Sequence, residues 1–499
     1  MTSRQTAPEP VPAGQHSTAA PFAALLIAVL SFSLMQTMVI PALPDLQQEF
    51  HTSTTTISWL LSSFLLTASV ATALLGRVGD MFGKRKVLIG SLVVFAVGTL
   101  LAALSTSMGM LIASRAVQGV GSAAFPLAFG IVRDQFPRER VPVAIGMISS
   151  TFGIGFGVGL VIPGPIIDAL SWHWVFWLGL IVILVGIAAV ATFIDESPVR
   201  SPGRIDWLGV VLLSGGIVAL LLAISQGKSW GWVSAGVIGL FVAAVVLLAV
   251  FALVESRVKE PLIDMELLRR PAVATSHIAA LIIGFGMYGA FTLMPLLAQT
   301  PSKVGYGFDA SVTESGLFMV PMAVTMLFAS PLAGRLGAAL GWKLPLVLAC
   351  LIGLVGFVIY AAAHDTEWTM YVGSGVLGIG VGFAFAALAN LVVSAVDPRQ
   401  TGEATGINTI TRTIGGSFGA QIAATVVASD VITGTRVPVE SGYTTAFSMS
   451  AVALGVATLA TLAGPGRLRR TPPAADPAHR TRAKRPAARP QAEPEEHHA

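Results

Sequence analysis

Two arginines lie inside long apolar stretches, where a charged side chain has chemical consequences. Arg115 is followed by Gln118 and Gly119, and Arg412 lies in a stretch rich in glycine and threonine. Residues three and four apart share one face of a helix, so Arg115, Gln118 and Gly119 would point the same way. A charge is costly in lipid and usually faces a cavity or a partner. The two arginines therefore indicate an ion or substrate pathway, with arginines satisfied by backbone carbonyls as the alternative.

A short polar stretch at residues 76–85 combines glycines, one acid and several cations. Gly76 and Gly83 flank Asp80, and Lys84 and Arg85 follow. Glycines let two backbones approach closely, and the Asp80 carboxylate can accept hydrogen bonds from the positive end of a helix. The stretch predicts a contact between two parts of the protein. The alternative is a basic loop that only sets membrane topology.

Side chains suited to catalysis or metal binding do not gather in the sequence. The single cysteine, Cys350, lies in an apolar run, and His173, His277 and His364 are far apart. One cysteine cannot form an internal disulfide, and the sequence has no metal-ligand spacing or phosphate-binding loop. We therefore predict that the protein is not an enzyme, has no cofactor and binds no nucleic acid.

The elements that must position these residues are membrane-spanning helices. The chain has 499 residues, of which 54% are hydrophobic and 11% charged, whereas a soluble domain carries about 25% charged residues. Apolar runs of about 20 residues, the length that spans a bilayer, recur along the chain. We expect fourteen of them, at residues 21–43, 56–76, 87–105, 109–131, 143–165, 173–194, 207–226, 233–254, 273–298, 313–334, 345–363, 369–394, 403–429 and 444–463.

The distribution of cations predicts the orientation of these spans. An even number puts both termini on one side of the membrane. With that side in the cytoplasm, 25 of the 30 Lys and Arg residues fall in cytoplasmic segments and three fall outside. Lys and Arg concentrate in the cytoplasmic loops of membrane proteins. We expect a multi-pass protein of the cell (plasma) membrane with both termini cytoplasmic.

The polar stretch at residues 76–84 recurs at residues 334–342. Three glycines and one arginine match in register, but Ala338 replaces Asp80. Each copy follows the second helix of a six-helix set, an arrangement known from transporters built of parallel repeats. We predict the following segments: a cytoplasmic tail (1–20), a six-helix half (21–194), an inserted pair of helices with flanking loops (195–272), a second six-helix half (273–463) and a disordered basic tail (464–499).

These motifs resemble those of the major facilitator superfamily. Residues 76–85 resemble its signature loop, and Arg115, Gln118 and Gly119 resemble its motif in the fourth helix. Smaller segments between residues 21 and 463 resemble the fourteen-helix drug:proton antiporter family. Their matching residues include Trp230, Gly231, Trp232, Pro261, Gln299, Pro321, Gly402, Gly406, Asn408, Arg412, Gly415 and Gly419.

The resemblance implies a role for each motif. It implies that a latch closes the cytoplasmic side while a central cavity opens outward, and that this latch comprises Gly76, Asp80, Gly83, Lys84 and Arg85. It implies a role in proton exchange for Arg115, Gln118 and Gly119.

Two departures from the family pattern bear on proton coupling and on the direction of transport. In the first helix, Met35 replaces an acid and Ile40 replaces an asparagine. A carboxylate there would be a natural proton or cation site. In the fifth helix, Leu160 and Pro163 replace a proline and a glycine of the motif that distinguishes exporters from importers.

Several side chains could line a cavity between the two halves. The predicted set comprises Met35, Gln36, Phe152, Tyr288, Asn390, Asn408 and Arg412. For any one of these residues, packing in the core is the alternative. A cavity with cations and no anions would favour neutral or anionic substrates over cationic ones.

We therefore predict an all-α secondary transporter of the major facilitator fold. Its expected function is proton-coupled efflux of small amphipathic molecules such as drugs or antibiotics, by alternating access. The alternative is a specific importer, or a carrier without proton coupling, of a neutral or anionic metabolite. The expected partners are a small-molecule substrate, protons from a gradient that supplies the energy, and the lipid bilayer, with the protein a monomer.

Overall fold

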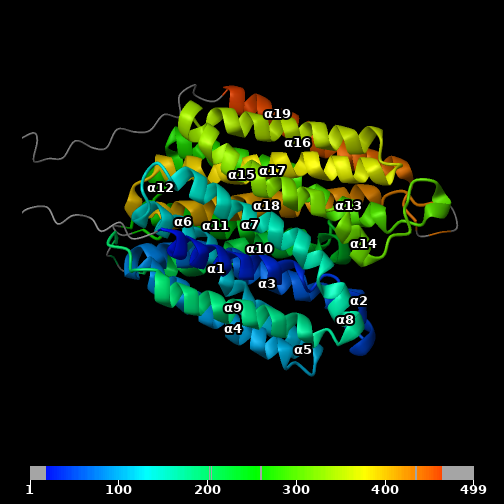
Figure 1. Ribbon diagram of the computed structural model, residues 1–499, viewed down its shortest axis with the longest axis horizontal. Coiled ribbons are helices and arrows are strands. Elements are labelled where there is room, and N and C mark those ends of the chain that lie inside the picture. Colours follow the sequence, from blue (N-terminus) through cyan, green and yellow to red (C-terminus); the bar gives the residue numbers. More distant parts are fainter. Residues whose placement is uncertain are drawn as a thin grey trace, which may run out of the picture. The chain divides into compact units, whose positions relative to one another are not determined.

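The computed structural model describes residues 18–201, 203, 205–258, 261–432, 435 and 437–463. Most of the predicted N-terminal tail and all of the C-terminal tail at 464–499 lie outside the described residues. The described chain is helical (Figure 1), apart from an isolated β-bridge between Val431 and Pro438. The prediction of an all-α protein is confirmed.

The first half and the inserted pair supply eleven α-helices and one 3-10 helix. They are α1 (Ala19–Thr37), α2 (Leu43–Glu49), α3 (Thr54–Phe82), α4 (Lys84–Ala103), α5 (Met108–Gln118), η1 (Gly119–Ala123), α6 (Ala124–Gln135), α7 (Val141–Val161), α8 (Pro163–Ala169), α9 (His173–Phe193), α10 (Trp207–Trp230) and α11 (Ala235–Glu255).

The rest of the chain follows in eight α-helices and two 3-10 helices. They are α12 (Met265–Arg269), α13 (Pro271–Ala298), η2 (Ser302–Val304), α14 (Val312–Leu317), α15 (Val320–Leu340), α16 (Lys343–Ala362), α17 (Glu367–Ala395), η3 (Pro398–Gln400), α18 (Thr401–Val427) and α19 (Glu440–Ala463).

Thirteen helical segments of the described chain are long and apolar enough to cross a membrane. Each of them overlaps one of the fourteen expected spans. The remaining expected span, 403–429, corresponds to α18, which is 27 residues long but carries many threonines and Arg412. Its polar side chains lower its hydropathy, so the fourteenth span stays a prediction.

Two expected helix ends are wrong, and each error has a local cause. The first helix ends at Thr37 rather than at residue 43, because Pro41 has no N–H group to donate to the carbonyl of Thr37. The second helix continues to Phe82 rather than ending at residue 76. Gly83, with φ of 115°, ends it, so Asp80 lies in the last turn of a helix and not in a loop.

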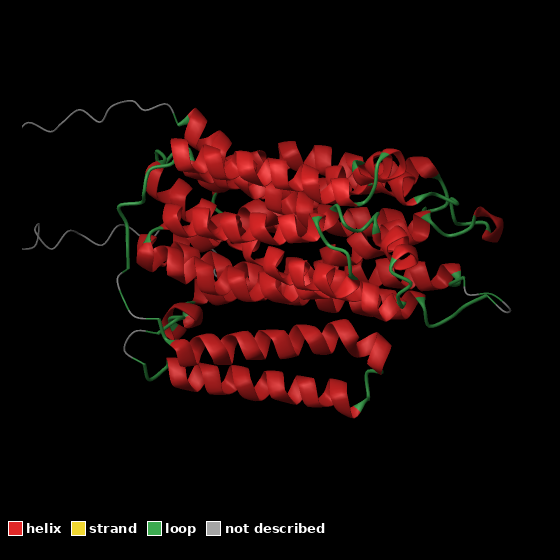
Figure 2. Ribbon diagram, turned by 90° about the horizontal axis from the view of Figure 1, so that it is seen from below, coloured by secondary structure: helices red, strands yellow, loops and turns green. Residues whose placement is uncertain are grey.

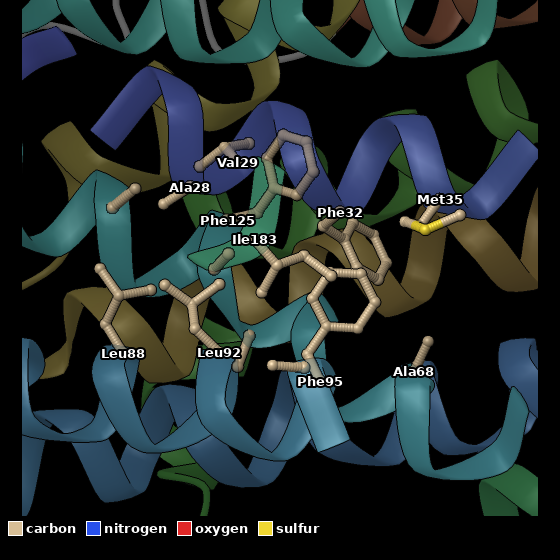
Figure 3. Packing of buried hydrophobic residues seen from close by; sticks show 14 of the residues in the cluster. Ala28, Val29, Phe32, Met35, Ala68, Leu88, Leu92, Phe95, Phe125 and Ile183 are labelled. Atoms are coloured by element: carbon tan, nitrogen blue, oxygen red, sulfur yellow. The ribbon is translucent and has the colours of Figure 1, made fainter. Parts of the chain in front are cut away.

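The buried apolar side chains form two large clusters. One is contributed almost entirely by α1–α9. In this cluster the ring of Phe32 packs against those of Phe95 and Phe125 (Figure 3). The other is contributed almost entirely by α13–α19. The α10–α11 hairpin lies beside the bundle formed by the other long helices (Figure 2). It packs through α10 against α3 and α18.

Glycines bring α3 and α18 into backbone contact. A Cβ atom added to Gly76 would lie 2.4 Å from the carbonyl oxygen of Gly402, and one added to Gly402 would lie 2.4 Å from that of Gly76. The same kind of contact joins α7 and α15, where a Cβ on Gly334 would lie 2.4 Å from the Pro142 oxygen. Small residues at these positions therefore allow the two halves to touch.

The repeated stretch has the same local geometry in both copies. Gly83 separates α3 from α4 with φ of 115°, and Gly341 separates α15 from α16 with φ of 92°. This backbone region favours glycine. The structural match supports the internal repeat inferred from sequence.

We predict that Gly76→Ala weakens the contact between α3 and α18. The added methyl group meets backbone rather than a flexible side chain, so we expect a loss of about 1–3 kcal/mol in the free energy of unfolding. Gly90→Ala is the matched control, because a Cβ at Gly90 meets nothing within 4 Å. Thermal unfolding of the purified protein in detergent compares the two. Equal stability would contradict the proposed backbone contact.

Candidate functional site

Asp80 joins the two halves at one end of the bundle. Its Oδ2 accepts a hydrogen bond of 3.0 Å from the backbone N–H of Glu403, which lies in the first turn of α18. The carboxylate thus lies at the positive end of that helix. The Asp80 carboxylate thus accepts the hydrogen bond that was expected from the N-terminus of a helix in the other half. We call Asp80, Glu403 and the residues bonded to them the latch.

Lys84 compensates the buried charge of Asp80 without crossing to the other half. Its Nζ lies 3.3 Å from Asp80 Oδ1 and 2.7 Å from Asp134 Oδ2, and all three side chains are inaccessible to solvent. Buried carboxylates require such partners. Lys84 therefore ties α3 to the end of α6 and holds Asp80 in place.

Arg85 does not reach the second half. Its guanidinium donates to the carbonyl of Ala191 in α9. The backbone N–H groups of Arg85 and Lys86 donate to the Glu196 carboxylate at 3.1 and 3.2 Å. Glu196 therefore caps the N-terminus of α4, and the carboxylate occupies the space where a Cβ on Gly83 would point. Arg85 therefore bonds within the first half, and its role in the latch stays a prediction.

Two other arginines make the bridges that sequence reasoning missed. Arg77 pairs with the Glu403 carboxylate at 3.4 Å. Arg133, at the end of α6, donates to Thr401 Oγ1 and to the Val396 carbonyl at 2.7 Å each. Arg77 is the arginine that recurs in the second copy of the repeat, and this recurrence could have indicated its importance from the sequence alone. Arg133 had no comparable signal.

The loops that flank the inserted hairpin also join the latch. The N–H of Ser201, before α10, donates to the Asp80 carbonyl at 2.7 Å. After α11, the N–H of Asp264 donates to Glu403 Oε1 at 2.9 Å, and Arg77 donates to the Pro261 carbonyl at 3.4 Å. The insertion is therefore bonded to both halves at the point where they meet.

Arg115 belongs to α5, and its fully buried side chain lies beside the C-terminal end of α1. Its Nη1 donates to the Met35 carbonyl at 3.1 Å and to Gln118 Oε1 at 2.6 Å, and its Nε donates to the Leu60 carbonyl at 3.2 Å. Met35 lies in the last turn of α1, where carbonyls lack helical partners. Gly119 lets α3 approach, since its Cβ would lie 2.6 Å from the Phe64 oxygen. This geometry fits the alternative of an arginine satisfied by carbonyls, and the role in proton exchange stays a prediction.

A central cavity of about 60 Å³ lies between the two halves. Four predicted residues, Gln36, Phe152, Tyr288 and Arg412, line it. Pockets for drug-sized ligands measure about 300–1,000 Å³, so the cavity is contracted in this conformation. Its other lining residues are Phe32, Phe64, Leu65, Ala68, Ser69, Thr72, Ser122, Phe125, Thr409, Ile410 and Thr413.

Three predicted cavity residues lie elsewhere. Met35 is fully buried in the first core cluster and packs on Gly179. Asn390 donates to the Pro142 carbonyl in the other half at 3.2 Å, and Asn408 donates to the Ser276 carbonyl at 3.4 Å. Both asparagines satisfy backbone carbonyls between helices, so their polarity reflects helix packing and not the cavity.

Aromatic rings close the cavity on the side away from the latch. Phe156 lies one turn beyond Phe152 in α7, and its ring centroid is 4.2 Å from that of Phe291 in α13. Tyr288 contacts both Phe291 and Phe152, with centroids at 5.4 and 6.5 Å. In this conformation the cavity therefore lies between the latch at one end and an aromatic contact between the halves at the other.

Comparison with known proteins identifies the class that this fold and cavity define. The family model described as Major Facilitator Superfamily matches residues 25–207 and 207–420. The chain belongs to this superfamily, and its described residues include thirteen helical segments that could cross a membrane.

Its relatives include transporters of several bacteria. An uncharacterised transporter of Mycobacterium tuberculosis is 33% identical over 80% of this chain, which spans 58% of that relative's length. The multidrug transporter protein MdtP of Bacillus subtilis is 28% identical, over 79% of this chain and 72% of the relative. The tetracenomycin C resistance and export protein of Streptomyces glaucescens is 28% identical, over 82% and 76% of the two chains.

A solved structure has the same fold. The human organic anion transporter MFSD10 superimposes with a TM-score of 0.67 over 90% of this chain and 100% of its own, at 16% identity. At that identity the likeness shows the fold alone.

We predict that Asp80→Asn loosens the latch. The variant loses the negative charge at the start of α18 and the ion pair with Lys84, while the side chain keeps its size. We expect a cysteine introduced at the cavity position Ser69 to react about tenfold faster with a soluble maleimide, as for a conformational shift of about 1.4 kcal/mol. The same cysteine in an Asp45→Asn background is the control, because Asp45 is an exposed residue of α2. An unchanged rate would argue against the latch.

Proposed function

We propose that this chain is a proton-driven exporter of small amphipathic molecules that works by alternating access. The observation that carries the proposal is the contracted cavity between the two halves, with the latch on one side and an aromatic contact on the other. Separation of the halves at one end at a time would expose the cavity to one side of the membrane at a time. The names of two relatives, a multidrug transporter and an antibiotic export protein, support export.

The proposal includes fourteen spans in a plasma membrane, with α18 as one of them and the latch end in the cytoplasm. An even number is supported because α1 begins and α19 ends at the same end of the bundle (Figure 1). The lysines and arginines that support this orientation include those of the latch. We propose that the protein acts as a monomer of two six-helix halves, 21–194 and 273–463, around the insertion at 195–272.

Proton coupling finds no carboxylate to act on among the described residues of the cavity. None of the described residues that line the cavity is an acid, and Met35 packs in the core. The buried carboxylates of Asp80 and Glu403 are instead the groups where proton uptake would act directly on the contact between the halves. A carrier of neutral or anionic metabolites without proton coupling, or a specific importer, is the second candidate, and the absence of a cavity acid favours it.

We expect inside-out membrane vesicles containing the protein to accumulate fluorescent amphipathic dyes when their lumen is acidified. An uncoupler should abolish this accumulation. Asp80→Asn should reduce it at least about tenfold without changing the abundance of the protein, whereas Asp45→Asn should not. Accumulation that ignores the gradient would indicate uncoupled transport, and accumulation only in right-side-out vesicles would indicate an importer.

A further inference from the structure

The cavity lining combines phenylalanine rings, hydroxyl groups and one charged side chain. The first half supplies four phenylalanines, Phe32, Phe64, Phe125 and Phe152. The second half supplies Tyr288, Arg412 and two threonines. A ligand held between the halves would therefore meet the four phenylalanine rings of the first half and the Arg412 cation of the second, with hydroxyl groups from both halves. Such a lining suits a molecule with an apolar ring system and one polar end.

Arg412 is a buried cation without an acidic partner. Only 9% of it is exposed, and its Nε has no hydrogen-bond partner within the described part of the chain. None of the four ion pairs found among the described residues involves it. Its guanidinium carbon lies 4.0 Å from the centre of the Phe385 ring, and the Tyr288 side chain lies beside it.

Arg115 provides the internal comparison. It is also buried, but three of its hydrogen bonds go to the carbonyls of Leu60 and Met35 and to Gln118. Among the described residues each arginine keeps one nitrogen without a hydrogen-bond partner, Nη2 of Arg115 and Nε of Arg412, but only Arg412 lines the cavity. A buried charge is costly without a partner, and carboxylates bind guanidinium groups with strong paired hydrogen bonds.

We propose that the cavity binds amphipathic organic anions. The acidic group of the substrate pairs with Arg412 once the halves have separated enough to admit it, and its ring system packs on the phenylalanines of the first half. The substrate itself supplies the counter-ion that the protein lacks. This inference rests on the proposed export function and adds the charge class of its substrate.

Three dyes of similar ring size but different charge test the inference: anionic fluorescein, neutral Nile red and cationic rhodamine 123. We expect vesicles with the unaltered protein to accumulate fluorescein in preference to rhodamine 123. Arg412→Gln should lower fluorescein uptake at least about tenfold, the equivalent of one charge-assisted contact, and should spare Nile red. Arg412→Lys, which keeps the charge, should retain part of the fluorescein uptake. Phe152→Leu is the control, and it should affect all three dyes alike.

A competition experiment without any variant covers the case in which Arg412→Gln does not fold. 1-Naphthoate should inhibit fluorescein uptake by the unaltered protein, and the cation 1-naphthylmethylammonium should not. Equal inhibition by the two, or equal losses for all dyes in Arg412→Gln, would overturn the inference while leaving export intact. Failure of the unaltered protein to transport any of the dyes would instead contradict the proposed function.

Discussion

The backbone contact between α3 and α18 is the constraint on which the rest of the site depends. At Gly76 and Gly402 the two helices approach so closely that neither position has room for a side chain. Only at this distance can the Asp80 carboxylate reach the N–H of Glu403. The contact therefore allows residues of one local motif to bond to the other half. Every other cross-half bond of the latch lies within a turn or two of this contact.

The latch consists of compensated charges rather than a single strong bond. Lys84 pairs with both Asp80 and Asp134, while Arg77 pairs with Glu403. Buried ion pairs contribute little net stability, because the cost of desolvation offsets their attraction, but removing one partner is costly. Such a network suits a contact that must form and break.

The inserted α10–α11 hairpin also contributes contacts to the latch. Its two flanking loops donate hydrogen bonds to Asp80 and Glu403, so opening the latch requires these loops to move as well. Phe251 of α11 packs with Leu262 and Ile263 of the following loop, which anchors that loop to the hairpin. The insertion therefore adds a layer of contacts to the latch that two six-helix halves alone would lack.

Most of the fold could be predicted from the sequence, because spans of about 20 apolar residues and a repeated glycine motif are local signals. The partner of Asp80 could be predicted as a helix N-terminus, but which helix depends on tertiary packing. Asn390 and Asn408 were assigned to the cavity because polar residues in apolar helices suggest function. Each satisfies a carbonyl of another helix instead, and no pattern in one sequence separates the two outcomes.

The two buried arginines are a further case in which one sequence does not reveal the role of a polar residue in an apolar helix. Pro41 ends α1 early, and this leaves carbonyls in the last turn of α1, including that of Met35, without helical donors; Arg115 fills that gap. Arg412 instead lies within the continuous helix α18 and lines the cavity. At an effective dielectric constant of about 20, a second cation 5 Å from Arg412 would be repelled by about 3 kcal/mol, and an anion would be attracted equally. The position of each arginine relative to the cavity, which only tertiary packing sets, thus distinguishes two residues that look alike in the sequence.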